Sequence, residues 1–230
     1  MGTKFSTRVW VSVVGIASIF FGSKGYADTV ISVADFGLKP DTRENAVAYV
    51  QKAIEACRGK EPVTLVFPEG RYDFWPQYAH EKNYYETNTY DVFPKRLAML
   101  FEGLHNITVD GNGSQFVMHD RIQPITVENC DGVTLKNFSI DWDIPLTAQA
   151  RVTKVGSDFF EIEINVLESP YIIEDGKLVF VGEGWKSALG SMIEFESDTH
   201  FVVPGTGDLV LGWNWGDYTA VSPRYGIVRL

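Results

Sequence analysis

The chain has 230 residues, of which 45% are hydrophobic and 22% charged, a balance typical of a globular protein with one large domain or two small ones. Its formal net charge at pH 7 is −10. An acidic surface argues against nucleic acids and anionic polysaccharides as partners, because these are attracted by positive fields. A neutral or cationic ligand is easier to accommodate.

The first 27 residues have the order of a secretory signal peptide. Lys4 and Arg8 precede the apolar run VWVSVVGIASIFFG. Gly25 and Ala27 then occupy the −3 and −1 positions of a cleavage site before Asp28. The run is short for a membrane-spanning helix, so we expect cleavage and no membrane span in the mature chain. The expected location is secreted, periplasmic or at the cell surface. Removing three basic residues and no acid changes the net charge from −10 to −13.

Short strands flank a single helix at the start of the mature chain. TVISVADFG reads as a strand. Asp41 and Glu44 have the spacing of a capping box, and apolar residues follow at helical intervals until Gly59, which predicts a helix over 45–57. VTLVFPEGRYDF then reads as strand, tight turn and strand.

The stretch WPQYAHEKNYYETNTYDVFP, from Trp75 to Pro94, has no clean period and predicts a long ordered loop. Two roles remain open for its aromatic side chains. They stack on a sugar face, or Tyr84, Tyr85 and Tyr90 pin the loop to the body of the protein.

Two consecutive segments repeat with an offset of 26 residues. MLFEGLHNITVDGNGSQ aligns with ITVENCDGVTLKNFSID, so that Phe101 matches Val127 and Ile107 matches Val133. Such a period indicates stacked units that share a core. Because the units are rich in short strands, we expect an all-β fold: a right-handed parallel β-helix with the 45–57 helix capping its open end.

The pattern changes after Pro145. AQARVTKVGSDFFEIEIN alternates and turns, and further short strands follow, which predicts a small antiparallel β-barrel-like insertion. The expected domains are the signal peptide at 1–27, the cap and first coils at 28–145, and the inserted β domain at 146–230, with a return toward the β-helix at GIVRL. A β-helix of about two coils without a closing cap is a poor free-standing unit, so we expect the N-terminal part of a longer protein. Cys57 and Cys130 are expected to be free thiols.

Asp141 and Asp143 in NFSIDWDIP are candidate catalytic carboxylates. In a strand they share a face, with Cα atoms roughly 6.5–7 Å apart. Carboxylates at about that separation can hydrolyse a glycosidic bond with inversion. No P-loop, G-x-S-x-G or zinc-ligand spacing occurs, so no metal and no cofactor are predicted.

Two resemblances sharpen this interpretation. ISVADFGLKPDTRENAVAYVQKAIEACRG and LVFPEGRYDF together resemble the N-terminal segment of secreted β-helix glycosidases of the polygalacturonase-like group. GRYDFWPQ, FPKRLAMLFEG, NITVDGNGSQF, MHDRIQP, TLKNFSIDWDIPLTAQA and LGWNWGDYTA…GIVRL resemble the bacterial α-1,3-galactosidases of glycoside hydrolase family 110. The second resemblance covers nearly all of the mature chain and departs locally at Phe93, where an Asn is expected.

The resemblance implies a secreted exo-enzyme that removes terminal α-1,3-linked galactose with inversion, from blood-group-B-type or linear Gal-α-1,3-Gal glycans. It also implies that the catalytic acids lie on later coils, beyond the position that matches Leu230. Asp141 and Asp143, with Trp142, then support the entry to the inserted domain or line a groove.

His119, Asp120 and Arg121 in MHDR are candidate sugar-binding residues, together with Trp142. The alternative is that the charged residues tie two coils together. Other functions also remain open: another β-helix glycosidase, a polysaccharide lyase, or a non-catalytic β-helix that binds glycans. Pectic lyases need calcium and basic residues against an acidic substrate, and this acidic chain has neither pattern.

Overall fold

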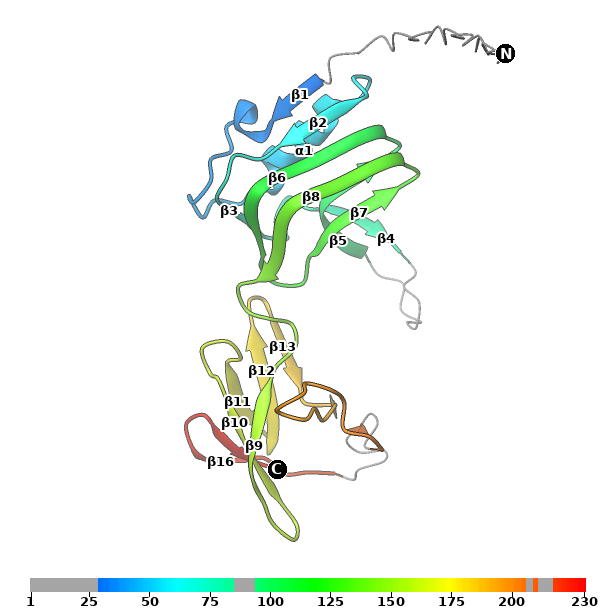
Figure 1. Ribbon diagram of the computed structural model, residues 1–230. Coiled ribbons are helices and arrows are strands. Elements are labelled where there is room, and N and C mark those ends of the chain that lie inside the picture. The colour runs from blue at the N-terminus through cyan, green and yellow to red at the C-terminus, as the bar shows by residue number, and fades with distance from the viewer. Residues whose placement is uncertain (1–28, 85–93, 206–208, 211–216) are drawn as a thin grey trace, which may run out of the picture.

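The computed structural model describes residues 29–84, 94–205, 209–210 and 217–230. The predicted signal peptide, Tyr85, Tyr90 and Phe93 lie outside these ranges. Figure 1 shows two β-rich parts joined by the chain that follows β8. The first part runs from β1 to β8 and the second from β9 to β17, and we use these two names below.

The first part is built on parallel strands. One sheet contains β1, β2, β6, β3 and β8, all paired in parallel, and a second sheet contains β4, β5 and β7, of which β5 and β7 are parallel. The strand bounds are β1 Thr29–Ser32, β2 Val63–Val66, β3 Arg71–Phe74, β4 His80–Asn83, β5 Pro94–Glu102, β6 His105–Met118, β7 Gln123–Glu128 and β8 Asp131–Trp142.

The register between these strands confirms the 26-residue repeat. Phe101 lies opposite Val127 in the β5–β7 pair, and Ile107 lies opposite Val133 in the β6–β8 pair. In parallel in-register pairing, equivalent positions of successive units lie side by side. Val133 of the second unit therefore packs against the core of the first, whereas Val127 is exposed. That core is continuous across both sheets and includes Phe67, Tyr72, Phe74, Phe101 and Phe116.

The register shifts once along β6 and β8, between Asp110 and Ser114. A Cβ atom on Gly111 would lie 2.5 Å from Phe138 Cβ and 2.7 Å from the Asn137 carbonyl oxygen, so only glycine fits here. At this corner Gly113 has a φ of 84°, which favours glycine for conformational reasons.

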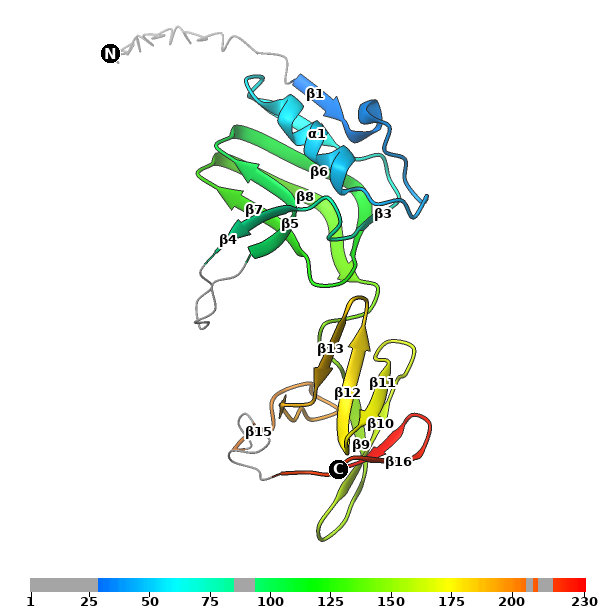
Figure 2. The same cartoon turned by 180° about the vertical axis from the view of Figure 1, so that it is seen from behind.

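Helix α1 (Val47–Cys57) packs against β5, β1 and β2 and against the short 3₁₀ helix η1 (Val33–Phe36), as Figure 2 shows from behind. The predicted capping box at Asp41 and Glu44 is wrong. Asp41 Oδ1 instead accepts from the Arg71 backbone N–H at 2.9 Å, and Asn45 Oδ1 accepts from the N–H of Val47, the first residue of α1, at 3.1 Å.

The stretch from Trp75 to Pro94 is not a single loop, because β4 lies within it and pairs antiparallel with β5. β2 and β3, on either side of the Pro68–Gly70 turn, do not form a hairpin with each other. Each pairs with β6, so this turn is a corner between two sides of the stack.

The second part is antiparallel, as the alternation after Pro145 predicted. One sheet has the order β16-β17-β10-β9 and another the order β11-β12-β13. The last strand, β17, pairs with β10 and β16, so the described residues show no return to the parallel strands. The bounds are β9 Ala150–Val155, β10 Phe160–Ile164, β11 Tyr171–Glu174, β12 Lys177–Gly182, β13 Trp185–Ala188, β14 Ser191–Met192, β15 Leu209–Val210, β16 Val221–Arg224 and β17 Ile227–Arg229.

Both cysteines are free thiols, as expected. Cys57, the last residue of α1, is buried, and this burial raises the pKa of its thiol to about 11. Cys130 Sγ lies between coils, where it accepts from the Leu104 N–H at 3.4 Å and donates to the Phe101 carbonyl oxygen at 3.3 Å. Among the described residues, none of the helices has the length and apolarity needed to span a membrane.

Candidate functional site at the junction of the two parts

A polar cluster lies where the first part meets the second. Figure 1 shows the β12–β13 hairpin pointing toward the first part, near the end of β8. Its turn carries Glu183, whose carboxylate reaches a cluster at the ends of β3, β6 and β8. We call these residues the junction cluster: Arg71, Asp73, His119, Asp143 and Glu183.

Asp73 is the buried centre of the junction cluster, with a fully buried side chain. Arg71 Nη2 donates to Asp73 Oδ1 at 2.6 Å, and His119 Nε2 lies 2.9 Å from the same oxygen. Burial alone would raise the pKa of Asp73, but the hydrogen bonds from Arg71 and His119 outweigh it and hold the pKa below its ordinary value. Asp73 is therefore an ionised structural carboxylate and is unsuited to donate a proton.

His119 follows β6 and is 3% exposed. Its backbone N–H donates to the Phe74 carbonyl oxygen at 2.9 Å, which fixes it beside β3. The ring stacks on Trp75, with centroids 3.8 Å apart and planes 11° from parallel. Nδ1 lies 2.8 Å from Glu183 Oε2, so this one side chain contacts carboxylates of both parts of the protein.

Because Asp141 and Asp143 are expected to share one face of a strand, their surroundings should be similar, and this prediction is wrong. Asp141 Oδ1 accepts from the Trp142 backbone N–H at 2.8 Å. Asp143 Oδ1 instead accepts from Arg71 Nη2 at 2.7 Å and lies 3.7 Å from Arg43. The strand ends at Trp142, and only Asp143 turns toward the cations.

Trp142, Asp120 and Arg121 lie next to the junction cluster. Trp142 is half-buried against the core and donates from Nε1 to the Asp120 carbonyl oxygen at 3.2 Å. The Arg121 guanidinium lies 5.5 Å from the ring centroid of Trp185, on β13. The predicted site residues other than Asp141 thus converge on one place, where they tie the coils together and tie the second part to them.

Three possible metal ligands in the junction cluster invite a test for a metal ion. One donor atom from each of Asp73, His119 and Asp143 lies within 4.8 Å of the others. The Arg71 guanidinium already occupies the space between the two aspartates, with contacts of 2.6 and 2.7 Å. The charge of Arg71 thus already neutralises these carboxylates, and the donor set does not fit a divalent ion.

Sequence reasoning missed Arg71, Asp73, Trp75 and Glu183. GRYDFW did contain a usable signal, because Arg71 and Asp73 alternate along a strand and so share a face. Glu183 had none, since it lies 64 residues from His119 and only the tertiary structure brings the two together.

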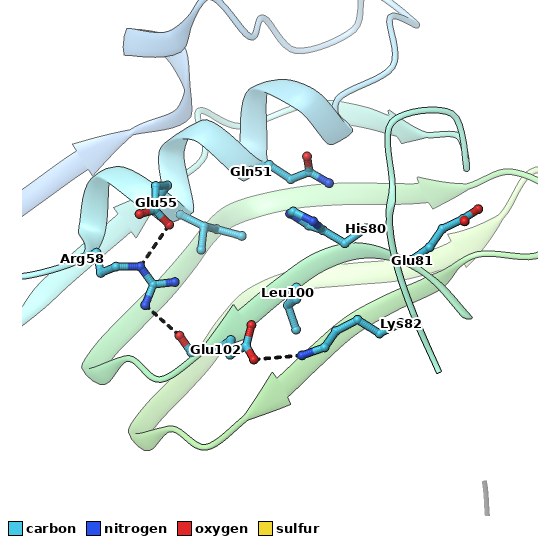
Figure 3. Close-up of a pocket in the computed structure, with 9 residues that line it drawn as sticks. Gln51, Glu55, Arg58, His80, Glu81, Lys82, Leu100 and Glu102 are labelled. Carbon is cyan, nitrogen blue, oxygen red and sulfur yellow. Dashed lines mark hydrogen bonds and ion pairs between the residues drawn. The ribbon is translucent and has the colours of Figure 1, made fainter. Parts of the chain in front are cut away.

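A second polar region lies between α1, β4 and β5. Figure 3 shows this pocket of about 280 Å³, lined by Gln51, Ile54, Glu55, Arg58, His80, Glu81, Lys82, Leu100 and Glu102. Most of its charged groups are paired with one another. Arg58 contacts Glu55 at 3.0 Å and the Glu102 carbonyl oxygen at 2.9 Å.

Lys82, which lines this pocket, bridges two acids at equivalent positions of the repeat. Its ammonium donates to Glu102 at 2.8 Å and to Glu128 at 2.7 Å, and these two residues are opposite each other in the repeat. Tyr84 also donates to Glu128, so this tyrosine pins its segment to the body of the protein, as one of the two predictions had it. The hydrogen bonds from Lys82 and Tyr84 lower the pKa of Glu128.

Comparison with known proteins shows what this chain is similar to. A family model described as "GLAA-B beta-barrel domain I" matches residues 148–230, which lie in the second part. Alpha-1,3-galactosidase B of Bacteroides thetaiotaomicron is 58% identical over 204 residues, which are 89% of this chain and 33% of that protein. Alpha-1,3-galactosidase A of Shewanella woodyi is 36% identical, over 73% of this chain and 28% of its own length. Alpha-1,3-galactosidase B of Parabacteroides distasonis is 33% identical, over 94% of this chain and 36% of its own length.

These similarities relate the chain to a class of proteins, the β-rich glycoside hydrolases. More specifically, the chain is similar to bacterial proteins named alpha-1,3-galactosidase, and residues 148–230 match the GLAA-B beta-barrel domain I family. It spans about a third of the length of the curated relatives that it matches.

Proposed function

We propose that this chain forms the N-terminal portion of a secreted exo-glycosidase that hydrolyses terminal α-1,3-linked galactose with inversion. The substrates would be blood-group-B-type or linear Gal-α-1,3-Gal glycans. The observation that carries this proposal is the 58% identity, over 89% of the chain, to a protein named alpha-1,3-galactosidase B. The acidic composition of this chain is compatible with an uncharged oligosaccharide substrate.

The first part is proposed to be the start of a right-handed parallel β-helix. Two observations support this. β5–β7 and β6–β8 are both parallel pairs, and both keep the 26-residue offset at their starts. Successive units therefore stack through two different sheets at once, which is the arrangement of a solenoid whose repeats contact only their neighbours.

The catalytic acid and base are proposed to lie outside the 230 residues. Inversion needs one protonated carboxylic acid and one carboxylate that activates water, on opposite sides of the bond. Asp73 has a lowered pKa and is buried, and Asp143 is paired with Arg71. The junction cluster then serves as a support that orients the second part, and the isolated chain is inactive.

A chimera tests the proposed function directly. This chain would replace the matching 204 residues of the Bacteroides thetaiotaomicron relative. The expected result is release of galactose from Gal-α-1,3-Gal, with the β-anomer appearing first in an NMR time course. Gal-α-1,4-Gal tests linkage selectivity, the parent relative is the positive control, and the isolated 230-residue chain is the negative control. A folded chimera that releases no galactose, or that gives the α-anomer first, would contradict the proposal.

A further inference from the structure

His119 lies between a carboxylate of the first part and a carboxylate of the second. Nε2 is 2.9 Å from Asp73 Oδ1, and Nδ1 is 2.8 and 3.0 Å from the two oxygens of Glu183. We propose that protonated His119 is a clamp that holds the β12–β13 turn against the first part, and that loss of one proton releases the turn. This inference does not depend on the proposed galactosidase activity.

The hydrogen-bond geometry requires two protons on the ring. A neutral imidazole has one N–H donor and one nitrogen lone pair, whereas the imidazolium has two donors. An ionised carboxylate only accepts. With carboxylate oxygens within 3.0 Å of both ring nitrogens, only the imidazolium makes two hydrogen bonds; a neutral ring would place a lone pair against an oxygen.

The surrounding charges also favour the imidazolium. Two cations and three carboxylates face the ring or its direct partners, so a positive His119 makes the cluster neutral. Trp75 stacks on the ring face, which favours a cation by electrostatic attraction to the π system. Asp120 and Arg121 follow His119 in the chain and add one charge of each sign. The facing charged groups are Arg43 from the loop before α1, Arg71 and Asp73 from β3, Asp143 from the end of β8 and Glu183 from the β12–β13 turn.

The structure decides which contact is lost when the ring becomes neutral. Asp73 is fully buried and needs its donors, so the remaining proton stays on Nε2. Glu183 is 33% exposed and can turn to water. Next to it, a Cβ atom on Gly184 would lie 2.6 Å from Asp120 Oδ2, so this turn is seated close to a second acid. When His119 is neutral, its positive charge no longer offsets the repulsion between the carboxylates of Glu183 and Asp120, which lie on opposite parts of the protein.

A distance measurement on the full chain tests the clamp. Val30 in the first part is 62% exposed and Leu167 in the second part is 86% exposed, so both accept a nitroxide after substitution by cysteine. The background carries Cys57→Ala and Cys130→Ser, and pulsed electron paramagnetic resonance gives the distance distribution. Measurements at about pH 5.5 and about pH 8.5 bracket the range in which histidine charge changes. We expect one narrow distribution at the lower pH and a broader one at the higher pH.

Glu183→Gln is the decisive variant, because it keeps the shape of the side chain and removes its charge. We expect its distance distribution to be the same at both pH values. Glu174→Gln is the matched control, since Glu174 lies in β11 of the same sheet and contacts Lys186 rather than His119. It should behave as the unsubstituted chain does. A distribution that ignores pH in the unsubstituted chain, a pH response that survives Glu183→Gln, or its loss in Glu174→Gln would each overturn the proposal.

Discussion

Arg71 and Asp143 are 72 positions apart in the sequence, and Arg71 Nη2 lies 2.7 Å from Asp143 Oδ1. The Nε–H of the same guanidinium is shared between the two carboxylate oxygens of Asp73, at 3.0 and 3.1 Å. One side chain thus joins an early coil to the residue at which the chain leaves β8 for the second part.

Arg71→Met should destabilise the protein by about 3 kcal/mol, because it leaves the buried Asp73 carboxylate without its main cation. Arg96→Met is the matched control, since Arg96 and Glu81 form an exposed pair at 3.4 Å. Such pairs contribute about 0–1 kcal/mol. Urea unfolding followed by circular dichroism measures both values. Equal losses in the two variants would show that Asp73 does not depend on Arg71.

Asp73→Asn should change the acid limb of the stability curve. The pKa of Asp73 is lowered in the folded protein, so its ionised form stabilises the fold fully above the unfolded-state pKa of about 3.9. This stabilisation is lost as the pH falls below that value toward the folded-state pKa. The stability difference between the unsubstituted chain and the variant, measured by urea unfolding, should be constant above about pH 5 and shrink below about pH 4. A difference that stays constant down to about pH 2 would contradict this assignment.

Gly111→Ala should destabilise the stack by about 1–3 kcal/mol, because the new Cβ atom would lie 2.5 Å from Phe138 Cβ. Gly190→Ala is the control, since nothing lies within 4 Å of the position of its Cβ atom. Thermal unfolding of the two variants should therefore separate them clearly. If both substitutions have the same effect, the coil corner is less tightly packed than the contact at Phe138 indicates.

Removal of a general acid or base lowers the rate of an enzyme by about 10²–10⁴-fold. Asp141→Asn and Asp143→Asn, made in the chimera, should each lower the rate of galactose release by less than this. Asp141 binds a neighbouring backbone N–H and Asp143 binds Arg71, so both have structural partners. The measurement is kcat with Gal-α-1,3-Gal, with circular dichroism as the folding control. A loss of about 10²-fold or more in a folded variant would restore that residue as a catalytic candidate.

Expression with residues 1–27 in a Gram-negative host should give protein outside the cytoplasm that begins at Asp28. The basis is the order of basic, apolar and small residues before Asp28. N-terminal sequencing of the periplasmic fraction measures it. Replacing Ala27 by a bulky residue such as Leu is the control, because it should block cleavage at this point. Periplasmic material that keeps Met1 would disprove the assignment.

The sequence predicted those features that depend on local periodicity. Ile107 and Val133 could be paired because parallel in-register stacking brings equivalent positions together, and the repeat is visible along the chain. The antiparallel nature of the second part followed from alternation for the same reason. The capping role of Asp41 was wrong because a more distant group, the Arg71 N–H, bonds to its carboxylate.

The candidate site was only half visible in the sequence. His119 and Asp143 were singled out, but their partners come from other coils or from the second part, at separations that no local pattern marks. The expectation that Asp141 and Asp143 share one environment assumed that the strand continues through both. Because β8 ends between them, their side chains reach different partners.

Lys82 limits how this protein can have grown by duplication. Glu102 and Glu128 occupy equivalent positions of two successive units, so they lie opposite each other on adjacent strands and repel. The ammonium that neutralises them comes from β4, an antiparallel strand that is not part of the 26-residue unit. A further copy of the coil would add another carboxylate at this position without adding another lysine. Any ancestor that lengthened the stack by simple duplication would have had to change this position in the new coil, or supply its counter-charge from elsewhere in the chain.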